Sequence, residues 1–125
     1  MTRIANTEEF NRMLADDKAV LFVFFNWSGQ AVLSLRLFEA WVEEWRASHP
    51  EASVSFYRLD PDDNRDSWTW LNQKSRNETE IDGGFGSVTW LRRGKCIAFV
   101  RYAAQAGREE LSRLTDEHFG TAKES

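Results

Sequence analysis

Hydrophobic positions change their spacing near the first quarter of the chain. Residues 19–25 form an unbroken apolar run, AVLFVFF, which is typical of a strand covered on both faces. From Ala31 to Trp45 the apolar residues instead recur at helical spacing, with charged residues between them. This helical stripe consists of Leu35, Phe38, Trp41, Val42 and Trp45. The pattern predicts a buried strand, a short turn at residues 27–30 and a long amphipathic helix.

Further helices and strands are predicted on both sides of this unit. Asn6 with Glu9 three residues later is a variant of the capping box, and predicts a first helix that buries Phe10, Met13 and Leu14. Two more helices are expected at residues 67–73 and 108–119, and the small-residue stretch 103–107 is expected to be a loop. Strands are predicted at residues 2–5, 54–59, 85–91 and 96–102.

The last two predicted strands form a hairpin around the turn at residues 92–95. In the second of them, simple alternation places Cys96, Ala98, Val100 and Tyr102 on one face. Ile97, Phe99 and Arg101 are then expected on the other face. Because the buried strand and the strand at 54–59 are joined through a helix, those two are expected to be parallel. The central sheet should therefore be mixed.

The turn between the buried strand and the long helix resembles the active-site segment of the thioredoxin family. Trp27-Ser28-Gly29-Gln30-Ala31 is similar to Trp-Cys-Gly-Pro-Cys, and the resemblance continues in order along the chain. Asn6–Phe10 resembles the start of the family's first helix, and Leu59–Asn64 resembles its Val-Asp-Val-Asp-Glu-Asn segment. Gly84–Ser87 resembles Gly-Ile-Pro-Thr, and it is followed by a strand and a turn as in the family. The position of the final helix, with Leu111 and Leu114, also agrees.

The resemblance implies a thioredoxin-like α/β fold, a three-layer α/β/α sandwich. Its central sheet would be mixed and would contain four or five strands. About four helices would cover the sheet, and Phe22 would be buried within it. A single domain is expected at residues 2–120, with a frayed tail at 121–125. The polar stretch from Lys74 to Gly84 is longer than the family pattern predicts, so it is expected to be an insertion of the kind that often binds partners.

Four residues depart from the chemistry that the resemblance would imply. Ser28 and Ala31 stand where the family has its two cysteines, Gly86 stands where it has a cis-proline, and Phe22 stands where it has a buried carboxylate. Disulfide exchange needs a thiolate and a second sulfur. Ser28 is expected to be a helix N-cap rather than a nucleophile, because no histidine or lysine is near it in sequence. The only histidines are His49 and His118.

The charge composition of the chain bears on which kinds of partner it can bind. The chain has 125 residues and a net charge of −4, with 16 basic and 20 acidic residues that form no blocks. This argues against nucleic acid or an anionic membrane as the main partner. The sequence shows neither a signal-peptide pattern nor an apolar run long enough to span a bilayer, so a cytoplasmic protein is expected. With one cysteine, the chain forms no intrachain disulfide and no cysteine zinc site.

Acidic residues gather after the strand at 54–59, and they raise the question of a metal site. The set is Asp60, Asp62, Asp63, Asp66 and, further on, Glu78. An EF-hand loop needs glycine at its sixth position and glutamate at its twelfth, and this segment has neither. A solvated turn with a helix-capping aspartate is therefore expected, with no metal and no cofactor.

Cys96 and the tryptophans each leave two interpretations open. Cys96 could be a reactive thiol, with Lys95 lowering its pKa, or a small apolar residue in a strand, and the second is favoured. Trp41 and Trp45 fit the core. Trp27 lies where the family exposes a tryptophan. Trp68 and Trp70 cannot both face inward on one short helix, so they form a candidate second surface or are partly buried.

The functional hypothesis is a redox-inactive thioredoxin-like module that binds a protein or peptide by backbone pairing. The expected groove consists of Trp27, Ser28, Gly29, Gln30, Phe85, Gly86 and Ser87, with the insertion at its side. The alternative is a protein related to thiol-disulfide oxidoreductases in redox homeostasis, with any thiol chemistry through Cys96. The sequence names neither the partner nor the pathway.

Overall fold

The computed structural model describes residues 1–75 and 85–120. The elements follow one another as β1 (Thr2–Ile4), α1 (Thr7–Ala15), β2 (Ala19–Val23), α2 (Gly29–Ser48), β3 (Ser55–Leu59), α3 (Arg65–Ser75), β4 (Ser87–Arg92), β5 (Lys95–Val100) and α4 (Ala103–Phe119). Residues 76–84, which include Glu78 and most of the expected insertion, lie outside the described residues, as does the expected tail at 121–125.

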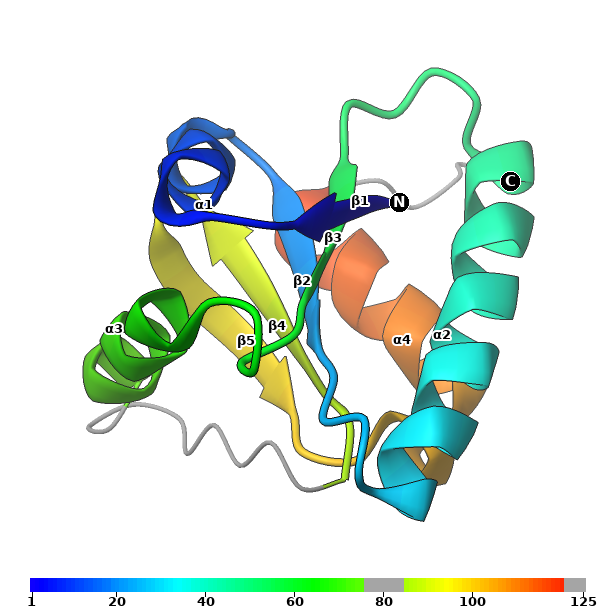
Figure 1. Ribbon diagram of the computed structural model, residues 1–125. Coiled ribbons are helices and arrows are strands. Elements are labelled where there is room, and N and C mark those ends of the chain that lie inside the picture. The colour runs from blue at the N-terminus through cyan, green and yellow to red at the C-terminus, as the bar shows by residue number, and fades with distance from the viewer. Residues whose placement is uncertain (76–84, 121–125) are drawn as a thin grey trace.

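The strands form one five-stranded sheet in the order β1-β3-β2-β4-β5 (Figure 1). β2 and β1 both run parallel to β3, whereas β4 pairs antiparallel with β2 and with β5. The parallel pair β2 and β3 is joined through α2, as the strand–helix–strand pattern predicted. The predicted mixed sheet is therefore confirmed, with β2 at its centre.

Helices cover both faces of the sheet, and each face has its own core. On the face covered by α2 and α4, Phe22 packs with Phe38 and Trp90 and is fully buried. On the face covered by α1 and α3, Leu21 packs with Phe10 and Leu71. Successive residues of β2 thus enter different cores, and all five residues of the strand are buried. This explains why the strand appears in the sequence as a continuous apolar run rather than an alternating one.

The N-terminal caps of the first two helices follow the sequence prediction. Asn6 accepts a hydrogen bond from the Glu9 backbone N–H at 2.9 Å, and Ser28 accepts one from the Ala31 N–H at 3.3 Å. Each cap satisfies a backbone donor that the helix itself leaves without a partner. In α3 the cap is Asn64 rather than the predicted aspartate: its Oδ1 accepts from the Ser67 N–H at 3.3 Å.

Two predictions about the C-terminal third are wrong. In β5 the pairing jumps from Trp90↔Ala98 to Leu91↔Cys96, so Ile97 is an extra residue in a β-bulge. Ile97 and Ala98 both pack on the α2–α4 core, whereas Cys96 packs on the α1–α3 core, so simple alternation fails.

The second difference is the expected loop at residues 103–107. Its first residues already belong to α4, because the Ala106 N–H bonds to the Tyr102 carbonyl at 3.0 Å. Gly107 then interrupts the helix with φ 83° and ψ 166°, a region used almost only by glycine. The glycine that favoured a loop therefore marks a kink inside the helix. No helix within the described ranges has an apolar stretch long enough to cross a membrane.

Candidate functional site

The candidate site begins where β2 ends and α2 starts. Ser28 is 5% exposed, and its hydroxyl accepts from the Ala31 N–H while it donates to the Gln30 Oε1 at 3.2 Å. This hydroxyl serves as a helix cap, as predicted. His49, a histidine that could have acted as its base, caps the far end of α2, about 30 Å away along a 20-residue helix. Within the described residues, the Ser28 hydroxyl is engaged with the start of α2 and not with His49.

Trp27 is the most conspicuous apolar side chain on this surface. It is 69% exposed, whereas the tryptophans of the α2 stripe are 1% and 3% exposed. Its ring lies 5.6 Å from the ring of Phe25, which in turn lies 6.0 Å from Trp68 in an edge-to-face arrangement. Phe25 was predicted as part of the buried strand, but β2 ends at Val23 and Phe25 links Trp27 to α3 instead.

Trp68 and Trp70, the predicted second surface, contact different parts of the molecule. Trp68 contacts Phe25 and so adjoins the Trp27 side of the molecule, whereas Trp70 packs edge-to-face on Phe10 of α1, with 5.6 Å between ring centroids. Both tryptophans are half-buried against the α1–α3 core. Partial burial, one of the two interpretations that the sequence left open, is what the structure shows for each.

Gly86 lies against the second turn of α2. Its φ is +90°, and a Cβ placed on it would lie 2.5 Å from Ser34 Cβ and 3.0 Å from Phe22 Cζ. Only glycine fits, both for its conformation and for its close approach. The Gly86 carbonyl accepts from the Ala103 N–H at 3.0 Å, whereas its N–H is bonded to none of the described residues. The close approach of Gly86 thus holds the start of β4 against α2.

Ser34 joins three segments that are distant in sequence. It is fully buried, and its hydroxyl donates to the Phe85 carbonyl at 2.9 Å and accepts from the Ala104 N–H at 3.1 Å. The start of β4 and the start of α4 are therefore both fixed to α2. Gln30 lies one turn before Ser34 on the same helix, about 6 Å along its axis. Phe85 and the Trp27–Gln30 turn are thereby brought to one edge of the sheet, as Figure 1 shows for the elements that carry them.

A small pocket of about 270 Å³ opens beside this edge. Its lining consists of Phe85, Arg101, Tyr102 and Gln105. The rings of Phe85 and Tyr102 stack with their centroids 5.4 Å apart, and the Arg101 guanidinium lies 5.4 Å from the Phe85 ring centroid. The described residues of the lining therefore include two stacked aromatic rings and a guanidinium close to one of them.

Solved structures share this architecture at low sequence identity. Thioredoxin from Plasmodium falciparum matches with a TM-score of 0.65 and 13% identity, over 94% of this chain and 99% of that one. Thioredoxin from Malassezia sympodialis matches with a TM-score of 0.67 and 17% identity, over 94% and 90%. A putative oxidoreductase with a thioredoxin fold matches with a TM-score of 0.70 and 9% identity, over 90% of each chain. This chain has a thioredoxin-like fold.

The match to the thioredoxin-like fold comes from structure alone, since no protein-family model and no curated protein matches the sequence. The predicted fold class is confirmed. With a single cysteine in the chain, the two-cysteine motif of thioredoxin is absent. Phe22, at the position that the resemblance assigns to a buried carboxylate, packs instead against Phe38, with 5.1 Å between the centroids of the two tilted rings.

Cys96 lies at the opposite end of the sheet from Ser28. It pairs with Leu91, which pairs with Ala19 at the start of β2, whereas Ser28 follows the end of that strand at Val23. The four residue-to-residue steps from Ala19 to Val23 span about 13 Å. Cys96 is half-buried against the α1–α3 core. Its sulfur is therefore too far away to complete a disulfide with a partner held at the Ser28 turn.

Arginines bind the carboxylates of the acidic turn. Asp60 is 6% exposed and receives two hydrogen bonds of 2.7 Å from Arg58, and Arg3 contacts both Asp60 and Asp63. The hydrogen bonds to Asp60 raise the pKa of the Arg58 guanidinium. The pairs fasten β1 to the end of β3. Across the described ranges, no three histidine, cysteine or acidic side chains lie together as metal ligands would.

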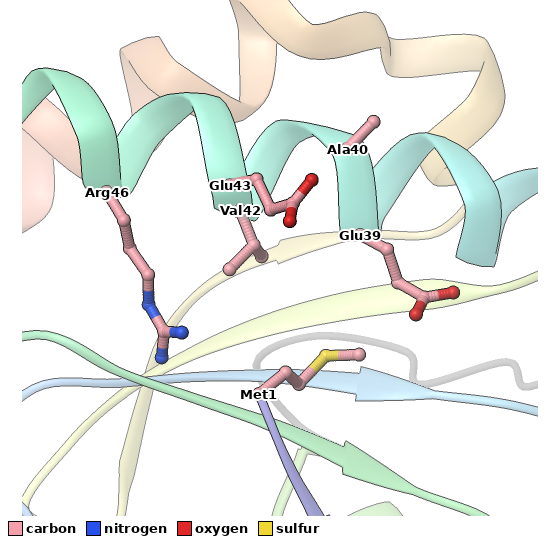
Figure 2. A pocket seen from close by; sticks show the side chains of 6 residues that line it. All are labelled: Met1, Glu39, Ala40, Val42, Glu43 and Arg46. Carbon is pink, nitrogen blue, oxygen red and sulfur yellow. The ribbon is translucent and has the colours of Figure 1, made fainter.

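A second depression, of about 480 Å³, lies between α2 and the start of β1 (Figure 2). Glu39 and Glu43 line it together with Arg46 and Met1, so it presents both signs of charge. The Arg46 guanidinium already lies 5.0 Å from the centroid of the Phe56 ring. This depression is far along α2 from Trp27 and contains none of the predicted site residues.

The predicted groove is thus only partly accessible. Trp27, Gly29 and Gln30 are exposed and Phe85 is half-exposed, whereas Ser28, Gly86 and Ser87 are buried. The sequence did not indicate Ser34 or Gln105 as site residues, and it placed Arg101 and Tyr102 only on the two faces of a predicted strand. No local pattern marks them, because they are brought to the site by the pairing of β4 with β5 and by the kinked start of α4.

Proposed function

We propose that this chain is a redox-inactive thioredoxin-like domain that binds an extended protein or peptide segment. The binding surface, called here the Trp27 groove, consists of the side chains of Trp27, Gln30 and Phe85 with the backbone of Gly29 and Gly86. The observation that carries the proposal is Trp27, 69% exposed at a helix-starting turn from which both thioredoxin cysteines are missing. Large exposed aromatics are enriched at sites of protein recognition.

The groove offers two kinds of interaction to an extended segment. The Gly86 N–H, bonded to none of the described residues, could pair with a carbonyl of the incoming backbone. The Trp27 ring would supply apolar contact area beside it, because it already rests on Phe25 and needs little reordering. The Ser28 hydroxyl caps α2 and the Ser87 side chain is buried, so neither side chain is proposed as a contact with the partner.

The alternative, thiol chemistry through Cys96, finds less support. A single sulfur cannot resolve a mixed disulfide within the chain. This one is level with Ala19, about 13 Å of strand before β2 ends, whereas the helix start that would lower its pKa follows the end of β2. We therefore place the function in recognition and not in disulfide exchange.

Selection from a displayed random-peptide library tests the proposal. Peptides selected on the wild-type protein should bind the Trp27→Ala variant at least ~1 kcal/mol more weakly, a loss of about fivefold in affinity by calorimetry. The melting temperature should stay nearly unchanged because Trp27 is mostly exposed. Trp27→Phe is the matched variant, since it keeps an apolar ring and should restore part of the affinity.

Two results would contradict the proposal. One is that the wild-type protein selects no peptide. The other is that Trp27→Ala binds the selected peptides normally, or loses them only because the domain unfolds. In that second case Trp68, which is joined to the groove through Phe25, becomes the next residue to test.

A further inference from the structure

We infer that α3 is a cover that opens away from the sheet while the rest of the fold stays intact. Opening exposes the face of β4 that α3 covers, beside the Trp27 groove. The inference goes beyond the proposed function and does not depend on it, because it concerns the free protein and needs no partner. It is carried by buried polar atoms that lie between α3 and β4. This set, called here the α3–β4 polar layer, consists of Asn64 Nδ2, Ser67 Oγ, Trp68 Nε1, Ser87 Oγ and Thr89 Oγ1.

Two hydroxyls of the polar layer come from β4. Ser87 pairs with Val23 and Thr89 pairs with Leu21, and both of these β2 residues belong to the α1–α3 core. Residues directly opposite each other in an antiparallel pair project from the same face of the sheet. The two hydroxyls therefore point to the face that α1 and α3 cover. Both residues are fully buried, and neither hydroxyl has a hydrogen-bond partner among the described residues.

The other three atoms come from the start of α3. Ser67 is 2% exposed and lies four residues before Leu71, so it shares the helix face that packs on the α1–α3 core. Trp68 contacts Phe25, which follows the end of β2, and this places the turn at the level where β4 begins. Ser67 Oγ, Trp68 Nε1 and Asn64 Nδ2 also lack a hydrogen-bond partner in the described part of the chain.

The polar layer makes the closed position of α3 less favourable than an apolar interface would be. Each of its atoms loses hydrogen bonds with water on burial and gains none in return. Opening restores the bonds with water, and this offsets part of the apolar contact that is lost.

The apolar contact that holds α3 is also small. Within residues 65–71, Leu71 is the only buried apolar residue, whereas α2 buries its whole apolar stripe from Leu35 to Trp45. Trp68 and Trp70 are half-buried. Elements with few buried apolar contacts open at a lower free energy than the whole domain unfolds.

The contacts at the start of α3 define what moves. Arg58 holds Asp60 with two hydrogen bonds of 2.7 Å, so the chain stays anchored at the end of β3 when the helix opens. Opening separates Trp68 from Phe25, whose ring also contacts Trp27. The movement of α3 therefore changes the support of the Trp27 ring.

The experiment is native-state hydrogen exchange of the free protein, followed by NMR at urea concentrations below the unfolding transition. The backbone amides of Thr69, Trp70 and Leu71 should exchange at least 100-fold faster than those of residues 38–42 in α2. Their exchange should also depend less on urea, because opening α3 exposes less surface than unfolding the domain does. Exchange of α3 as slow and as urea-dependent as that of α2 would overturn the inference.

The double variant Ser67→Ala with Thr89→Val tests whether the polar layer is the cause. It removes two buried hydroxyls at nearly constant shape, and should slow exchange of the α3 amides at least tenfold. Ser48→Ala is the matched control, since that hydroxyl donates to the Glu44 carbonyl on α2, and it should leave α3 exchange unchanged. Unchanged or faster α3 exchange in the double variant would show that these hydroxyls do not disfavour the closed state, and would overturn the inference. If the double variant does not fold, the comparison of α3 with α2 in the wild-type protein decides.

Discussion

At the level of single residues, Gly86 shows how this chain differs from a thioredoxin without losing the fold. The resemblance places a cis-proline at this position, yet here the backbone has φ +90°, which proline cannot adopt. The close approach to Ser34 and Phe22 leaves no room for a side chain. Glycine is thus a requirement of the packing, and the N–H that proline would lack is a consequence of it.

We expect Gly86→Ala to lower the free energy of unfolding by about 2–4 kcal/mol, because a methyl group would meet Ser34 Cβ at 2.5 Å in a conformation unfavourable for alanine. Urea unfolding measures this. Gly29→Ala is the control: a Cβ there has nothing within 4 Å, so stability should stay the same or rise by up to about 1 kcal/mol. Equal effects of the two substitutions would contradict the close packing at Gly86.

The hydrogen bonds of a residue could be predicted from the sequence where its partner is only a few residues away, and could not where the partner is distant. The caps at Asn6 and Ser28 involve backbone donors three residues away, and both were predicted correctly. Ser34 bonds to Phe85 and Ala104, 51 and 70 residues away, and nothing in its local sequence indicates this. Of the candidate site, the Trp27–Gln30 turn was therefore visible in the sequence, whereas the pocket beside it was not.

At the level of elements, the same reasoning explains which boundaries were predicted. Hydrophobic periodicity locates β2 and α2, because their patterns reflect burial on each element alone. The bulge at Ile97 depends on how β5 pairs with β4, and it moves Cys96 to the face opposite Ala98. The start of α4 depends on the bond from Ala103 to Gly86, which the sequence does not reveal.

The junction of α2, β4 and α4 leads to a prediction at this scale. Ser34→Ala removes a fully buried hydroxyl and leaves the Phe85 carbonyl and the Ala104 N–H without their partner. We expect a loss of about 1–3 kcal/mol in the free energy of unfolding. Ser48→Ala is the control, since that hydroxyl only donates to the Glu44 carbonyl one turn earlier, and should change stability by less than ~0.5 kcal/mol. A neutral Ser34→Ala would show that the junction does not depend on this hydroxyl.

At the level of the whole molecule, the fold separates the single thiol from the helix start. The antiparallel pairing of β4 with β2 and with β5 places the β4–β5 turn and Cys96 at one end of the sheet, and the Trp27 groove at the other. In Figure 1 the start of α2 lies beside the β5–α4 connection, at the end of the sheet opposite the turn between β4 and β5. A thiol at Cys96 therefore cannot use the helix macrodipole that favours a thiolate at the start of α2.

The protein should accordingly fail to reduce insulin disulfides with dithiothreitol as the electron source, because the groove contains no sulfur and Cys96 has no second cysteine to resolve a mixed disulfide. Cys96→Ser should behave as the wild type in this assay and in peptide binding. As a positive control, Ser28→Cys with Ala31→Cys in the Cys96→Ser background restores two sulfurs three residues apart on the first turn of α2, where an intramolecular disulfide should form on oxidation. Insulin reduction by the wild-type protein that disappears in Cys96→Ser would assign the activity to that thiol and overturn a function in binding alone.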